Sequence, residues 1–412
     1  MTEIDMSLAL SKGKWRKRIC VATASLFAAL LVAELLLRTV WPVGGCVLAL
    51  HDRYLFAPIP NSAKVQFLQP SLTSLGVTVR VNGHGMRGPE PDSERGRPRI
   101  MVFGDSFVMS DNEPYAKTFS AQLAGQWQDR VEVLCAGVTG YGPDQTLLRM
   151  EDMLPKYKPD GVVLVFCSYN DLGDPVRNHL MHVNDRGGLT RIQASAHVSE
   201  VQWFERRLSE SDAWGLARLW NTHSVIRNWT PVTRETTATM VDYLRSHRED
   251  YQAHALRGET IAISLLRDVY DADVALQPEW PSSIYKVRLM EAILKEIRTL
   301  CETHSVPLAA VVVPGGPDMD PESWLKVERR LYPSYKRNNL CNAISGASQR
   351  AGIETLNLFS IFDERAEQED LFVGPVDPHW NANGMRLGAE ACAEFLGDQE
   401  ALPFLSGTLS SD

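Results

Sequence analysis

The chain has 412 residues, of which 44% are hydrophobic and 23% are charged. This composition supplies a large apolar core and excludes disordered, collagen-like and low-complexity chains. The formal net charge is −9, from 42 Lys and Arg against 51 Asp and Glu. Because a broad nucleic-acid interface needs an excess of basic side chains, we expect no nucleic-acid partner. The length allows about two to three domains, or one α/β domain enlarged by insertions.

The N-terminal residues combine positive charge with the one long apolar run of the chain. Residues 1–18 contain five basic and two acidic side chains. The apolar run, residues 19–37, contains Glu34 as its only charge. At ~1.5 Å per residue such a run forms about 28 Å of helix, close to the roughly 30 Å hydrocarbon core of a membrane. Positive charge ahead of the run favours a cytoplasmic N-terminus. We therefore predict a single-pass membrane protein with a basic cytoplasmic tail (1–18), a transmembrane anchor (19–41) and an extracytoplasmic domain, periplasmic or extracellular. A cleaved signal peptide is the alternative, but the run is long for one and no small-residue cleavage site follows it cleanly.

Residues 42–98 are predicted to connect the anchor to the next domain. They are rich in Pro, Gly and polar residues, with one alternating stretch, residues 77–81, that leads into the turn-forming residues 82–85. This pattern indicates a short strand that ends in a turn. The nearby Arg87 either lies close to a functional site or belongs only to a turn.

From residue 99 onward, short apolar runs alternate with amphipathic stretches. The runs are rich in β-branched residues and bounded by Gly, Pro or polar residues, which is typical of buried parallel strands. The predicted strands are residues 100–103, 131–135, 161–167, 308–313 and 353–358, and the predicted helices are residues 115–128, 143–156, 284–303, 335–351 and 382–396. The alternation predicts an α/β domain over residues 99–400, with a doubly wound, flavodoxin-like and mostly parallel five-stranded sheet covered by helices on both faces.

Two segments fall outside this alternation. Residues 175–283, after the third strand, are predicted to form a mostly helical insertion, and residues 401–412 form a C-terminal tail. The seven cysteines include no CxxC pair, and the HxxH spacing of His179 and His182 has no carboxylate or Cys partner at ligand spacing. We therefore predict neither a metal site nor another cofactor.

The ends of the predicted strands carry side chains suited to acyl transfer. Ser106 follows the first strand, a glycine loop that includes Gly140 follows the second, and Asn170 follows the third. Asp377 and His379 follow the fifth strand, after an acidic helical stretch. Ligands of an open parallel sheet bind beyond the carboxyl ends of the strands, so these residues are expected to converge on one edge. They supply a nucleophile, a backbone donor, a side-chain donor, and a base with the carboxylate that orients it.

These residues resemble the four blocks of the SGNH (GDSL-like) hydrolases, over about residues 99–175 and 305–397. The Gly-Asp-Ser sequence that ends at Ser106 is similar to the first block, so the resemblance implies that this serine is the nucleophile. Gly140 and Asn170 match the second and third blocks. The resemblance implies that they form the oxyanion hole together with the backbone of Ser106.

His379 resembles the base of the last block, with Asp377 as its orienting carboxylate, and two positions depart from the family pattern. The second block usually opens with Asn, where this chain has Cys135. The last block is usually Asp-x-x-His, whereas Pro378 alone separates the two residues here. The shorter Asp-x-His-Trp sequence, which ends at Trp380, is similar to that of SGNH-like proteins that O-acetylate exported polysaccharides, including alginate.

Several of these residues also have ordinary structural interpretations. Ser106 is a common N-cap residue of a helix. Asp377 with its following proline is typical of a turn, and Asn170 with the next aspartate is typical of an Asx turn. The tryptophans of the insertion either line a sugar-binding cleft or pack amphipathic helices.

Together these features predict a membrane-anchored serine esterase that acts on acyl esters, expected to be O-acetyl groups of a cell-surface or exported polysaccharide. One alternative is an O-acyltransferase, in which a sugar hydroxyl resolves the acyl-serine intermediate. Another is a noncatalytic polysaccharide-binding or assembly protein, and export or assembly machinery is a candidate partner. The tail contributes +3 to the total of −9, so the remainder carries −12. A negatively charged chain repels an anionic polymer at long range. We therefore expect a neutral glycan as the substrate, or else a basic cleft whose local charge is hidden by the net charge of the chain.

Overall fold

A computed structural model describes residues 3–39, 47–66, 76–184, 186–192, 271–320, 327, 329–374 and 377–398. Its centre is a five-stranded sheet in which every neighbouring pair of strands is parallel. The strands, in the order in which they lie side by side, are β11 (Glu354–Asn357), β10 (Leu308–Val313), β7 (Gly161–Cys167), β5 (Arg99–Phe103) and β6 (Glu132–Cys135). Read from β6 and numbered along the chain, this order is 2-1-3-4-5, the flavodoxin-like arrangement. The predicted doubly wound α/β fold is confirmed, and each strand begins and ends within one residue of its predicted range.

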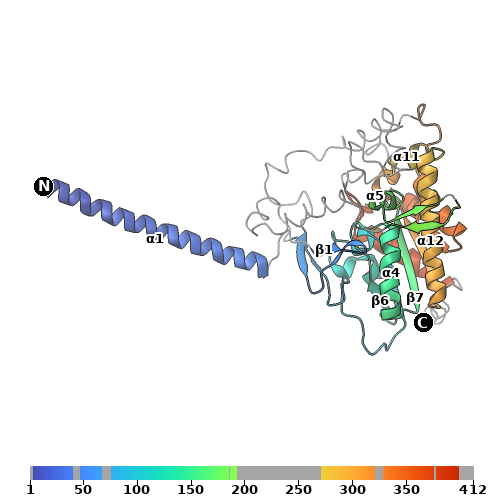
Figure 1. Cartoon of the computed structure of the whole chain (residues 1–412), viewed down its shortest axis with the longest axis horizontal. Helices are drawn as coiled ribbons and strands as arrows, with labels where there is room; N and C mark the ends of the chain where they lie inside the picture. The colour runs from blue at the N-terminus through green and yellow to red at the C-terminus, as the bar shows by residue number, and fades with distance from the viewer. Residues whose placement is uncertain are drawn as a thin grey trace.

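Helices cover both faces of this sheet, as predicted. On one face lie α4 (Pro143–Tyr157), α12 (Pro281–Thr303) and α15 (Asn339–Arg350). On the other face lie α3 (Phe119–Gln126), α16 (Phe359–Arg365) and α17 (Ala382–Asp398). Figure 1 shows α4 and α12 side by side over their face of the sheet.

The sequence of β7 shows why its apolar run is continuous. Its even-numbered residues from Val162 to Phe166 face one apolar core, and its odd-numbered residues from Val163 to Cys167 face the other. All seven residues of the strand are buried. Because side chains alternate along a strand, a strand covered on both faces is apolar at every position.

Two helices begin later than predicted. The helix predicted over residues 115–128 is divided into η1 (Tyr115–Lys117) and α3, because Thr118 adopts an extended conformation and its side chain caps α3. The helix predicted from residue 335 begins at Asn339, because turns occupy the preceding residues.

Residues 42–98 contain more β-structure than the single predicted strand. β4 (Val77–Arg80) confirms that strand and pairs with β3 (Ala63–Gln66), while β1 (Leu48–His51) pairs with β2 (Leu55–Pro58). Both pairs are antiparallel. Apolar residues of this segment, such as Phe56, join the same core as α4 and α12. The described part of the segment is therefore packed into the α/β domain, which its Pro- and Gly-rich composition does not predict.

The described ends of the insertion after β7 contain both helices and strands. The elements are α5 (Asp174–Asn178), the antiparallel strands β8 (Met181–Val183) and β9 (Leu189–Arg191), and α11 (Ala272–Leu276). Most of the segment predicted to be helical, residues 193–270, lies outside the described residues, as does the predicted tail at residues 401–412.

α1 (Glu3–Thr39) projects away from the rest of the chain as one long rod (Figure 1). It contains a 22-residue span, Trp15–Leu36, that is long and apolar enough to cross a membrane, and that is almost entirely unburied. A signal sequence near an N-terminus has the same features. The same helix includes most of the residues predicted as a basic tail.

Short elements lie beyond the carboxyl ends of the strands. α2 (Ser106–Met109) follows β5, α13 (Gly316–Met319) follows β10, and the antiparallel pair β12 (Phe372–Gly374) and β13 (Asp377–Trp380) follows α16. β13 packs against both α2 and α13. This packing brings distant parts of the sequence to one edge of the sheet.

Candidate active site

The ends of β5 and β7 mark the point where the strand order changes direction. From β5 the chain passes to β6 on one side, and then to β7, β10 and β11 on the other. In sheets of this kind, ligands bind beyond the carboxyl ends of the strands at this point. Ser106 follows β5 and Asn170 follows β7, so both predicted residues lie at that edge.

The turn before Ser106 accounts for the Gly-Asp-Ser sequence. A Cβ at Gly104 would lie 2.6 Å from the carbonyl oxygen of Val165, so the neighbouring strand leaves room only for glycine. Asp105 is fully buried, and its carboxylate accepts a hydrogen bond from the N–H of Phe107 (2.8 Å). The N-cap residue of α2 is therefore Asp105, and the alternative interpretation of Ser106 as an N-cap is wrong.

Ser106, His379 and Asp377 form a continuous chain of hydrogen bonds. Oγ of Ser106 lies 2.7 Å from Nε2 of His379, and Nδ1 of His379 lies 2.5 Å from Oδ1 of Asp377. The backbone N–H of His379 also donates to Oδ1 of Asp377 (3.0 Å), so one carboxylate holds both the ring and the backbone. The side chains of His379 and Asp377 are 31% and 38% exposed, which leaves the group accessible to a ligand. Asp377 and His379 lie in β13. They do not lie in the turn that an aspartate followed by a proline is also typical of.

Asp377 controls the proton affinity of His379. Burial alone would lower the pKa of His379, but the hydrogen bond and negative charge of Asp377 outweigh it and raise that pKa above 6.5. Burial would likewise raise the pKa of Asp377, yet hydrogen bonds from the ring and backbone of His379 hold it below its ordinary value. The aspartate therefore stays ionised beside an imidazole that accepts a proton readily.

Aromatic rings fix β13 against α2. Trp380 is fully buried, and its indole N–H donates to the carbonyl of Phe107 (2.9 Å). The side-chain amide of Asn112 donates to the carbonyl of Trp380 (2.9 Å), and the ring of Phe107 lies 5.0 Å from that of His379. The tryptophan after the histidine thus fixes the position of His379 relative to Ser106.

Gly140 lies in the loop after β6 with a left-handed backbone (φ +82°), a conformation that favours glycine. Its carbonyl accepts a hydrogen bond from Arg177 (3.0 Å), and a Cβ added at this position would lie 3.5 Å from Cζ of Phe56. Within the part of the chain that the structure describes, the backbone N–H groups of Gly140 and Ser106 form no hydrogen bond. Both groups are therefore available to a ligand oxygen.

Asn170 is buried, and its side chain contacts two carboxylates. Nδ2 donates to Oδ2 of Asp174 (2.6 Å), and the side chain also forms a hydrogen bond with Asp105. Burial raises the pKa of Asp174 to about 8. Asn170 thus connects the loop after β7 to the residue that caps α2. Its role as an oxyanion donor stays a prediction, because a ligand oxygen would compete with these carboxylates for the amide hydrogens.

A buried ionic network holds the loop that carries Asn170. Asp271, where the insertion returns to the domain, accepts hydrogen bonds from two backbone N–H groups of this loop, at 2.9 and 3.1 Å. Nζ of Lys286, on α12, lies 2.8 Å from a carboxylate oxygen of Asp271 and 2.8 Å from one of Asp273. Lys286 is 1% exposed, so its charge depends on these partners.

Arg87 lies beneath the residues that follow α2 rather than in a surface turn. It is 2% exposed, and its guanidinium donates to the backbone carbonyls of Met109, Ser110 and Glu113. It therefore supports the helix that begins at Ser106.

Cys135 occupies the position where the resembled family has Asn. It is buried, its thiol donates to the carbonyl of Val108 (3.4 Å), and burial raises its pKa. This contact keeps the end of β6 linked to α2.

The sequence analysis missed Lys286, although a signal for it exists. Lys286 lies at helical spacing with the buried residues Met290, Ile293 and Ile297 of α12. A lysine on the apolar stripe of a helix indicates a buried charge that needs carboxylate partners. The sequence contains no such signal for the three backbone partners of Arg87, because every residue has a carbonyl group that could accept these hydrogen bonds.

The arrangement can perform nucleophilic catalysis. Nε2 of His379 can take the proton of the Ser106 hydroxyl while Oγ attacks a carbonyl carbon, and Asp377 stabilises the resulting imidazolium. Within the described residues, no group of three or more His, Cys, Asp or Glu side chains is arranged to hold a metal ion.

Comparison with known proteins gives low similarity. No protein-family model and no curated protein matches the chain. The chain is similar in structure to an acetyl xylan esterase, AlAXEase, with 13% identity over 72% of this chain and 98% of that chain and a TM-score of 0.34. It is also similar to LAE5, an α/β hydrolase from the metagenome of Lake Arreo, Spain, with 11% identity over 76% of this chain and 97% of that chain and a TM-score of 0.36. A member of the lipolytic G-D-S-L family from Veillonella parvula gives 11% identity over 73% of this chain and 99% of that chain, with a TM-score of 0.32.

Proposed function

We propose that the chain is a serine esterase that hydrolyses acyl esters, with O-acetyl groups of a glycan as its substrate. The observation that carries this proposal is the hydrogen-bonded chain from Ser106 through His379 to Asp377, with distances of 2.7 and 2.5 Å. A serine hydroxyl is a weak nucleophile unless an adjacent base, oriented by a third group, accepts its proton. These three side chains meet that requirement at the edge of the sheet where ligands bind.

The reaction would proceed through an acyl-serine intermediate. Oγ of Ser106 forms a bond to the ester carbonyl carbon while its proton passes to Nε2 of His379. The imidazolium then gives this proton to the alcohol oxygen as the bond between that oxygen and the acyl carbon breaks. Water then gives a proton to the same nitrogen and attacks the acyl carbon. The bond between that carbon and Oγ breaks, Oγ takes the proton back from His379, and the acid is released. The N–H groups of Ser106 and Gly140 would stabilise the oxyanion, with Asn170 as a third donor.

An O-acyltransferase is the second candidate, and the Asp-x-His-Trp sequence around His379 favours it. In this reaction a sugar hydroxyl attacks the acyl-serine in place of water, and His379 accepts the proton of that hydroxyl. The partial exposure of His379, at 31%, supports access for an acceptor.

We further propose that α1 anchors the chain in a membrane, with the α/β domain outside the cytoplasm. The apolar span Trp15–Leu36 and the five basic residues among the first 18 support this orientation. A cell-surface or exported polysaccharide is the substrate that such a location would offer, and export or assembly machinery is the partner that it would allow.

The test compares the full chain with Ser106→Ala, both in detergent, using p-nitrophenyl acetate. We expect turnover by the wild type and only the uncatalysed rate with Ser106→Ala, because the attacking hydroxyl is absent. With a glycan acceptor present, the ratio of free acetate to acetylated sugar separates hydrolysis from transfer. Equal turnover by the two chains would contradict the proposal. A folded wild type that neither turns over the ester nor reacts with a fluorophosphonate would favour a noncatalytic glycan-binding protein instead.

A further inference from the structure

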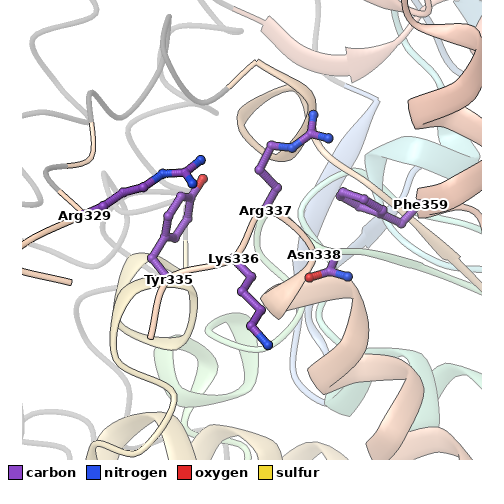
Figure 2. Close-up of a pocket in the computed structure, with 6 residues that line it drawn as sticks. All are labelled: Arg329, Tyr335, Lys336, Arg337, Asn338 and Phe359. Atoms are coloured by element: carbon purple, nitrogen blue, oxygen red, sulfur yellow. The ribbon is translucent and has the colours of Figure 1, made fainter. Parts of the chain in front are cut away.

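A basic pocket lies beside the site and takes no part in the Ser-His-Asp chain. It has a volume of about 290 Å³ and is lined by Arg329, Tyr335, Lys336, Arg337, Asn338 and Phe359 (Figure 2). Figure 2 shows Arg329 and Tyr335 on one side, Asn338 and Phe359 on the other, and Lys336 and Arg337 between them. The lining therefore combines three cations, two aromatic rings and one amide.

The charge of the basic pocket is opposite to that of the chain as a whole. Residues 326–337 contain five basic side chains and one acidic one, whereas the whole chain carries −9. Both Arg329 and Lys336 are exposed, and neither has a carboxylate partner among the described residues. Within the described residues, these two cations of the pocket are thus available to a ligand.

The third cation, Arg337, is held by the fold. Nη2 of its guanidinium donates to both carboxylate oxygens of Asp363 (2.7 and 2.8 Å), and the guanidinium lies 5.6 Å from the centre of the Phe359 ring. It also donates to the carbonyl of Met319 (3.4 Å), at the end of α13. Arg337 therefore fixes one part of the lining, and a ligand would pair with Arg329 and Lys336.

The basic pocket adjoins the catalytic groups through α13. This short helix follows β10, ends at Met319 and packs against β13, the strand that carries His379. Phe359 begins α16, which follows β11, so it also lies beyond the carboxyl ends of the strands. α13 therefore contacts both the strand that carries His379 and Arg337 of the pocket lining, so a polymer bound along this edge of the sheet would meet both.

We propose that the basic pocket binds a carboxylate-bearing sugar unit, so that the esterase acts on an acidic glycan. This inference rests on the proposed function and names its substrate class. Guanidinium and ammonium groups pair with carboxylates. Phe359 is 9% exposed and lies beneath Arg337, so it forms the floor of the pocket and supports the cations. The volume, close to the lower end of the roughly 300–1,000 Å³ range of small-molecule sites, suits one sugar unit. Arg329 and Lys336 are exposed to water, so their charge would add nothing to the binding of a neutral glycan.

The pocket also explains how an acidic chain would accept an acidic polymer. Repulsion between the net charge of the chain and the polymer is screened beyond about 8–10 Å at ordinary salt concentrations. Cations in direct contact with a carboxylate act within that distance. The local charge of the pocket therefore outweighs the average charge of the chain.

The experiment uses the full chain and two matched substrates. One is O-acetylated oligogalacturonate, and the other is the same oligomer after reduction of its carboxylates to hydroxymethyl groups. The variants are Arg329→Gln, Lys336→Gln and the double variant. Arg330→Gln is the control, because Arg330 is also exposed and lies outside the pocket lining. Hydrolysis of p-nitrophenyl acetate, which has no carboxylate and no sugar, measures the Ser-His-Asp chain in every variant.

We expect the wild-type KM to be about 5- to 20-fold lower for the acidic oligomer, and the double variant to lose this preference. Arg330→Gln should keep the preference, and every variant should hydrolyse p-nitrophenyl acetate at the wild-type rate. Added salt should narrow the preference, because exposed ion pairs are screened. Equal KM values for the two oligomers in the wild type, or an unchanged preference in the double variant, would overturn the proposal.

A binding measurement distinguishes failure of the pocket from failure of the esterase. Ser106→Ala is titrated by calorimetry with unacetylated oligogalacturonate and, separately, with inorganic phosphate. If the oligomer binds, and if this binding is lost when Arg329 and Lys336 are both replaced, the result supports the pocket. This holds even if the wild type hydrolyses no ester. No binding of the oligomer, or phosphate binding of equal strength, contradicts a site for an acidic sugar.

Discussion

The indole N–H of Trp380 donates to the backbone carbonyl of Phe107 at 2.9 Å, across a separation of 273 residues in the sequence. Phe107 directly follows Ser106 in α2, and Trp380 directly follows His379 in β13. This buried hydrogen bond therefore sets the position of Ser106 relative to His379. Small displacements between reacting groups reduce rates steeply, so the bond should affect catalysis more than its free energy alone implies.

The Trp380→Phe substitution tests this relationship by removing the N–H while keeping a buried ring. We expect kcat/KM for p-nitrophenyl acetate to fall at least about tenfold. The free energy of unfolding should fall by about 1–3 kcal/mol, from the lost hydrogen bond and the smaller ring. The carbonyl of Phe107 also accepts from the hydroxyl of Ser110 (2.9 Å), so it keeps one partner. Steady-state kinetics and denaturant unfolding measure the two effects.

Trp127→Phe is the matched control for that substitution. Trp127 is fully buried in the same apolar core as Trp380, and its indole N–H forms no hydrogen bond within the described residues. Its replacement should leave kcat/KM unchanged. Equal losses of activity in the two variants would show that ring volume, and not the bond to Phe107, positions His379.

Replacement of Asp377 by Asn tests the origin of the raised pKa of His379. Catalysis needs the neutral imidazole, so the wild-type kcat/KM should rise with pH through the pKa of His379, with a midpoint above 6.5. In Asp377→Asn the charge that raises this pKa is gone and burial lowers it, so the midpoint should move to lower pH. The plateau rate should fall by about 10²–10⁴, because the ring also loses its orientation. A pH–rate profile with an unchanged acid limb would contradict this explanation.

The sequence predicts the sheet well because the strands are buried on both faces. A continuous apolar run such as β7 has few other interpretations, and the polar residues after such runs lie at one edge of any parallel sheet. Ser106, Asp377 and His379 were therefore predictable from their places after strands, together with the family resemblance. Their contact distances were not predictable, because they depend on the packing of Trp380 against α2.

Other features escaped prediction because they depend on contacts between distant segments. The strand pairs β1–β2 and β3–β4 were not predicted because their alternating patterns are short. The first pair is stabilised by packing against the glycine loop and α4, and the second by packing against Met109 of α2. Arg87 pairs with backbone carbonyls, which any sequence supplies. The amide of Asn170 contacts carboxylates that its position after β7 does not reveal.

The Lys286→Met substitution tests whether the buried ionic network positions the loop that carries Asn170. It leaves Asp271 and Asp273 buried without their cation, so we expect the free energy of unfolding to fall by about 3–5 kcal/mol. At a temperature where the variant stays folded, kcat should fall while KM changes little, because in the proposed mechanism Asn170 of this loop stabilises the oxyanion of the transition state. A folded variant with wild-type kcat would limit the network to a structural role. Lys295→Met, on the exposed side of the same helix, should change the free energy of unfolding by less than about 1 kcal/mol and leave kcat unchanged.

The Gly104→Ala substitution tests the packing of the turn before Ser106. The added Cβ would lie 2.6 Å from both the Val165 carbonyl oxygen and the Val108 side chain, so the backbone must move and carry Ser106 with it. We expect kcat/KM to fall about 100-fold and the free energy of unfolding to fall by about 1–3 kcal/mol. Gly125→Ala, near the end of α3 with no atom within 4 Å of the added Cβ, is the control. Gly125→Ala should stabilise the chain by up to about 1 kcal/mol and leave the kinetics unchanged. Wild-type kinetics in Gly104→Ala would instead show that Ser106 tolerates a displaced turn.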